Sequence, residues 1–165
     1  MLELIVIVVA AALLGGAVFD QVLPVVDRSE RLAFMRMQRQ LQNALTLEAA
    51  TLIAEGHPER LGELGALNPM GLFRAPPPSY LGSLPWPNPA GLPGGVWYYD
   101  EHSSSLAYRV GKHTRFDGLG GPSNRVEFRV VFVFDDRDGD GTFDAARDQF
   151  DGLRFEPRHA YRWPD

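Results

Sequence analysis

The first part of the chain has the pattern of one long apolar helix. Every residue from Leu4 to Phe19 is uncharged, and most are Leu, Ile, Val or Ala. A helix rises about 1.5 Å per residue, so residues 1–23 would extend roughly 34 Å and cross a hydrocarbon layer of about 30 Å. We therefore predict a hydrophobic transmembrane or filament-core helix over residues 1–26.

This segment fits a signal peptide or a buried core helix less well. A cleavable secretory signal would show a basic leading region, but no Lys or Arg precedes Leu4, and no cut-site break follows Phe19. A buried helix of a soluble protein, apolar on all sides, would need a larger surrounding shell than a chain of 165 residues offers.

The helix continues beyond this segment with an amphipathic pattern over residues 27–56. Its apolar positions recur at steps of three and four residues and are Phe34, Met37, Leu41, Leu45, Ala49 and Leu52. Gly56 followed by Pro58 is a typical helix end. One stripe of this half should therefore cover a globular head that spans residues 27–165.

Residues 57–95 carry nine of the thirteen prolines and predict an ordered, Pro/Gly-rich loop on the core. Residues 96–165 predict a small antiparallel sheet. Its expected strands are Val96–Tyr99, Leu106–Val110, Arg125–Phe134 and a short one near Leu153–Phe155 or His159–Tyr161. The fold class is α+β, with the long helix packed on three or four strands.

Composition and charge narrow the function classes. The chain has 21 acidic and 16 basic residues and a formal net charge of −5, which argues against nucleic-acid binding. The absence of cysteine excludes a disulfide scaffold, a zinc site of the Cys type and a cysteine nucleophile. No acid/base or nucleophile constellation stands out, so we do not expect an enzyme.

Residues 136–148 form the clearest chemical motif, because carboxylates at alternate positions with glycines between them can fold around one hard cation. The predicted calcium ligands are Asp136, Asp138, Asp140, Thr142, Asp144 and Asp148. Arg147 stands where an EF-hand loop has its bidentate Glu, so the match is incomplete. The alternative is a solvated acidic turn between two strands.

The amino-terminal residues resemble a known superfamily. Met1 to Val8 reads Met-Leu-Glu-Leu-Ile-Val-Ile-Val, which is similar to the signature of type IV pilins and type II secretion pseudopilins. The signature Glu usually stands fifth in the mature chain. Glu3 is third, so either the chain begins inside the mature protein or its start was assigned late.

The resemblance implies a pilin-like fold and a structural role. It implies a single-pass protein of the inner membrane, with its head in the periplasm, that is later extracted by an assembly platform. The chain would then join other pilin-like subunits in a periplasmic or extracellular filament, where Glu3 would register neighbouring subunits. The alternative for Glu3 is a terminal carboxylate in the headgroup zone, stabilised by the positive end of the helix dipole. Several pseudopilins hold calcium in a carboxyl-terminal loop, and many pilins close this region with a disulfide, which this chain lacks.

Short downstream motifs are similar to minor pilins of mannose-sensitive haemagglutinin type systems. They are Asn68–Leu72, Pro77–Gly82, Gly95–Asp100 and Leu106–Tyr108. Two alternatives to a pilus subunit stay open: a pseudopilin of a type II secretion system, and an anchored periplasmic binding module that never polymerises.

Overall fold

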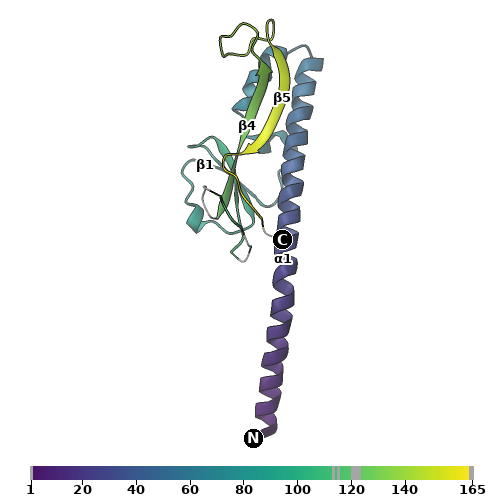
Figure 1. Cartoon of the computed structure of the whole chain (residues 1–165), viewed down its shortest axis with the longest axis vertical. Helices are drawn as coiled ribbons and strands as arrows, with labels where there is room; N and C mark the ends of the chain where they lie inside the picture. The colour runs from purple at the N-terminus through teal and green to yellow at the C-terminus, as the bar shows by residue number, and fades with distance from the viewer. Residues whose placement is uncertain (1, 113, 115, 120–123, 164–165) are drawn as a thin grey trace.

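A long helix and a sheet lie side by side in the computed structural model, which describes residues 2–112, 114, 116–119 and 124–163, and side chains from residue 28 onward within these ranges. The helix α1, Leu2–Ala54, runs the length of the molecule, and the sheet flanks only its carboxyl-terminal half (Figure 1). Among the residues whose side chains are described, no helical segment is long and apolar enough to cross a membrane. The predicted membrane segment 1–26, with Glu3, does not belong to these residues.

The second half of α1 packs on the head as its pattern predicts. Its buried residues are Phe34, Leu41, Leu45, Ala49 and Leu52. The helix ends at Ala54, and Gly56 adopts the left-handed conformation, with φ +81°. The amide of His57 then donates to the carbonyl of Leu52 at 2.8 Å, which closes the helix end. The amphipathic helix is confirmed.

The sheet has five strands in the order in which they occur along the chain. They are β1 Tyr80–Leu84, β2 Val96–Asp100, β3 Ser105–Arg109, β4 Arg125–Asp135 and β5 Gln149–Pro157. The strands β2 to β5 pair antiparallel, as expected. The strand β1 pairs parallel with β2, so the prediction of a purely antiparallel sheet of three or four strands was wrong.

The parallel pairing of β1 with β2 results from the path of the Pro-rich connector, residues 57–95. A parallel neighbour needs a connection that returns the chain to the starting end of the sheet. Residues 85–95, which include the short 3-10 helix η3, Pro89–Gly91, make that return between β1 and β2. The same connector contains the 3-10 helices η1, Pro58–Gly65, and η2, Pro69–Leu72, which bury Leu61, Leu64 and Met70. The connector is therefore ordered on the core as predicted, but the prediction of a loop over all of residues 57–95 was wrong, because this range contains the strand β1.

Two hydrophobic clusters hold the helix to the sheet. The first surrounds Phe34 and Leu41 and includes Trp97, Tyr108 and Phe128 from the sheet. The second lies nearer the end of α1 and contains Leu45, Ala49, Leu52, Leu61, Leu64 and Leu153. Together they fix one face of the helix against one face of the sheet and leave the opposite helix face exposed.

Candidate functional site

The acidic loop, residues 136–148, connects β4 to β5 at the end of the head beyond the last turns of α1 (Figure 1). It borders a groove of about 460 Å³, and the first residues of η1 form the other side of this groove. The groove is lined by Pro58, Glu59, Phe143, Asp144, Ala145 and Ala146. The loop therefore presents carboxylates beside a partly apolar surface.

Asp136 shapes the first half of the loop. Its two carboxylate oxygens accept hydrogen bonds from the amides of Gly139 at 2.7 Å and Gly141 at 2.9 Å. Both glycines have φ +77°, a conformation that residues with a Cβ rarely adopt. The alternation of Asp and Gly thus folds this stretch into a tight turn around one carboxylate.

Asp148 closes the loop at its other end. Its side chain is buried, and its two oxygens accept from the amides of Arg137 at 3.0 Å and Asp144 at 2.8 Å. One carboxylate thus joins the first and last thirds of the loop. Without it, two amides of the loop would lose their acceptors.

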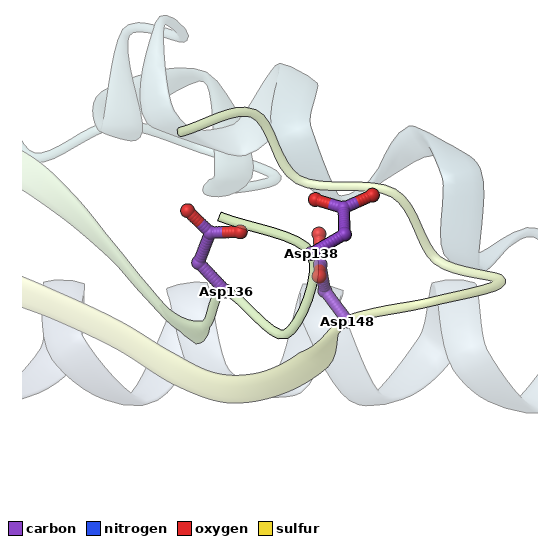
Figure 2. A group of neighbouring side chains, drawn as sticks. All are labelled: Asp136, Asp138 and Asp148. Atoms are coloured by element: carbon purple, nitrogen blue, oxygen red, sulfur yellow. The ribbon is translucent and has the colours of Figure 1, made fainter. Parts of the chain in front are cut away.

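Three of the six predicted ligands come together. One carboxylate oxygen from each of Asp136, Asp138 and Asp148 lies within 4.8 Å of the others, and Figure 2 shows the three side chains on neighbouring stretches of the loop. Of the other three predicted ligands, Asp140 and Asp144 are not part of this triad, and Thr142, predicted to offer its backbone carbonyl, has no carboxylate that could join it. The carboxylates of Asp140 and Asp144 instead accept from the backbone two residues ahead, at 2.7 and 2.9 Å.

Arg147 adds a positive charge beside the triad. Its Nη1 lies 3.0 Å from Asp138 Oδ2, and its Nε lies 3.6 Å from Asp144 Oδ2. The guanidinium is two-thirds exposed, so each ion pair contributes only about 0–1 kcal/mol. A cation at the triad would compete with Arg147 for Asp138.

The donor set fits a hard divalent cation. Carboxylate oxygens are the ligands that calcium and magnesium prefer, and the three carboxylates of the triad are close enough to share one ion. Calcium takes about 6–8 oxygen ligands, so water or further loop oxygens would complete its shell. Nothing in the triad selects calcium over magnesium.

A second polar cluster joins α1 to the end of β3, and the sequence pattern did not reveal it. The Glu30 carboxylate accepts hydrogen bonds from the Tyr108 hydroxyl at 2.9 Å, the Gly111 amide at 2.8 Å and the Thr114 hydroxyl. A Cβ on Gly111 would lie 2.5 Å from Glu30 Oε2, so only glycine permits this approach. Glu30 stands four residues before Phe34, on the buried helix stripe, which is the one signal that could have identified it.

The Glu30 cluster also keeps Tyr108 neutral. Burial raises the pKa of the Tyr108 hydroxyl, and the charge and hydrogen bond of Glu30 raise it further. The hydroxyl therefore remains a donor to the carboxylate, and the cluster is saturated by its own partners.

No family model, curated protein or solved structure matches the chain.

Proposed function

We propose that this protein is a structural subunit of a type IV pilus-like filament, held in the inner membrane before assembly and polymerised through its amino-terminal helix. The observation that carries the proposal is the division of α1. Its buried positions in the head run from Phe34 to Leu52, whereas the uncharged sequence Leu4–Phe19 belongs to the part of the same helix that extends beyond the head (Figure 1).

An apolar helix needs an apolar environment to cover it. Lipid tails and sister helices are equally apolar, so transfer from membrane to filament is driven by close packing between helices. A carboxylate such as Glu3 is costly in that setting unless it is paired. In the filament we assign its partner to a positive group of a neighbouring subunit, most simply the terminal amine, which sets the register.

Replacing Glu3 with alanine tests this role. We expect the Glu3→Ala chain to remain in the inner-membrane fraction at wild-type level and to lose filament incorporation by at least tenfold, because the registering charge is gone. Glu3→Asp keeps the charge and serves as the matched control. The measurement is immunoblotting of sheared filaments and membranes from cells that carry the assembly machinery. Wild-type incorporation of the Glu3→Ala chain would contradict the role of Glu3.

The acidic loop has a separate proposed role. We propose that Asp136, Asp138 and Asp148 hold a calcium ion, which supplies a central positive charge to stiffen a head that has no disulfide. Asp140, Thr142, Asp144 and water would complete the shell after local rearrangement. The convergence of the triad supports this proposal, and the resemblance to calcium-binding pseudopilins favours calcium as the ion.

Chelation should therefore destabilise the full-length protein. Ligand at 100 times its Kd stabilises a fold by about 2.7 kcal/mol, so EGTA should lower Tm by roughly 5–10 °C, and added calcium should restore it. Asp138→Asn should abolish the response, whereas Asp151→Asn, at an exposed aspartate outside the loop, should retain it. Differential scanning calorimetry in detergent measures the shift. A Tm that responds to neither EGTA nor calcium would contradict the calcium site and support the alternative interpretation of the loop as a solvated acidic turn.

Two related functions make different predictions for cell fractionation. A pseudopilin of a type II secretion system would assemble only when that secretion system is present. An anchored periplasmic binding module would stay in the membrane under all conditions.

A further inference from the structure

The negative charge of this protein is concentrated at one end of the head. Residues 135–151, the acidic loop with its flanking strand ends, contain seven aspartates and two arginines. Their net charge of −5 equals the formal net charge of the whole chain, so the remaining residues are balanced overall. The calcium ion proposed above would leave this segment with a net charge of −3 and therefore still negative. The acidic loop is therefore a local negative patch and not a sample of a generally acidic surface.

A positive patch lies on the exposed side of α1. Arg28, Arg36 and Arg39, here called the arginine face, are all exposed. At about 100° per residue they fall within an arc of roughly 80°, on the side of the helix opposite Phe34 and Leu41. None of the three forms an ion pair with another residue in the described part of the chain.

Apolar side chains accompany both patches. Leu32 and Met35 stand among the three arginines and are 52% and 42% exposed. On the acidic side, the groove lining includes the partly exposed Phe143, Ala145 and Pro58. Each patch therefore offers apolar contact area together with a charge of one sign, and the two signs are opposite.

The two patches cannot neutralise each other within one molecule. The acidic loop lies beside Pro58, beyond the end of α1 at Ala54, whereas Arg39 stands fifteen residues earlier in that helix. A rise of about 1.5 Å per residue separates Arg39 from the helix end by about 22 Å, and Arg28 by about 39 Å. Both separations exceed the Debye length of about 8 Å at physiological salt.

We propose that the acidic loop of one copy docks on the arginine face of a second copy. The contact joins two different surfaces, displaced by about 20–40 Å along the helix axis, so it is heterologous and leaves one patch of each kind free at the ends. Repetition of such a contact builds an open helical array, not a closed dimer. The inference rests on the proposed filament function for its setting, and it names the head surfaces that meet there.

Engineered disulfides test the contact cleanly because the chain has no cysteine. The full-length Arg39→Cys/Asp144→Cys double variant, oxidised in sheared filaments, should give a ladder of dimers, trimers and longer species on a non-reducing gel. The single variants Arg39→Cys and Asp144→Cys lack one half of the contact and should stay at least tenfold less crosslinked. Arg154→Cys/Asp144→Cys, which moves the first cysteine to an exposed position on β5, is the matched control and should give no ladder.

Failure of the docking contact and failure of the proposed function give different results. Filaments without a ladder overturn the docking contact and keep the filament function. If no filaments form, oxidation in membranes decides: a ladder there supports the docking contact and refutes the filament function. The absence of a ladder in both fractions overturns the contact. Binding of the arginine face to vesicles of anionic lipid, without any ladder, also overturns it.

Discussion

Replacing Phe34 with alanine is expected to lower the free energy of unfolding by about 3–5 kcal/mol, the usual cost of deleting a buried aromatic ring. Phe34 is only 1% exposed and joins the helix to the sheet. Its ring centroid lies 4.9 Å from that of Tyr108, 5.1 Å from that of Trp163 and 5.5 Å from that of Trp97. Alanine would leave a cavity among rings that are held by two different strands and the carboxyl-terminal segment.

Urea unfolding of the full-length protein in detergent, followed by tryptophan fluorescence, measures this loss directly because Trp97 stacks on Phe34. Leu47→Ala is the matched control, since Leu47 lies on the same helix but is 69% exposed. We expect it to change the free energy of unfolding by less than about 0.5 kcal/mol. A Phe34→Ala loss below about 1 kcal/mol would show that the helix does not depend on this cluster for its attachment.

Replacing Glu30 with alanine is expected to cost about 2–4 kcal/mol, because three donors lose one shared acceptor. An unsatisfied buried donor costs about 1–3 kcal/mol, and partial access of water reduces the sum. The Gly111 amide and the Tyr108 and Thr114 hydroxyls all point to this carboxylate. The carboxyl-terminal end of β3 would then lose its polar attachment to α1.

The same urea measurement tests the Glu30 cluster, with two comparison variants. Glu30→Gln keeps one acceptor oxygen and should lose roughly half as much stability. Glu48→Ala removes a glutamate of the same helix for which the described residues provide no hydrogen bond or ion pair, and it should be nearly neutral. Equal losses in Glu30→Ala and Glu48→Ala would remove the special role of Glu30.

Local periodicity was sufficient to predict the main elements. The steps of three and four residues from Phe34 to Leu52 define the buried stripe of α1, because an α-helix repeats every 3.6 residues. The alternation from Val126 to Phe134 predicted β4, because successive side chains of a strand point to opposite faces. Each of these signals lies within a single segment of the chain.

Contacts between distant segments were not predictable in the same way. The parallel pairing of β1 with β2 depends on the path of residues 85–95, which periodicity does not describe. Glu30 and Tyr108 are 78 positions apart in the sequence. The helix periodicity alone shows only that Glu30 is a carboxylate on an otherwise apolar face, and it does not identify its partners. In the acidic loop, spacing placed Asp136, Asp138 and Asp148 in one predicted ligand set, and the structure brings these three carboxylates together, while their role as metal ligands stays a prediction. Spacing did not show that Asp140 and Asp144 accept local backbone hydrogen bonds and are not part of this triad.

The central proposal is that many copies of this chain assemble through the first half of α1. Electron cryo-microscopy of filaments sheared from cells that express the full-length protein tests it most directly. We predict a filament whose axis is a bundle of helices contributed by residues 2–26, with the α+β heads of this chain arranged around it. Recovery of the protein only as separate copies in the inner membrane, with none in the filaments, would contradict the proposal.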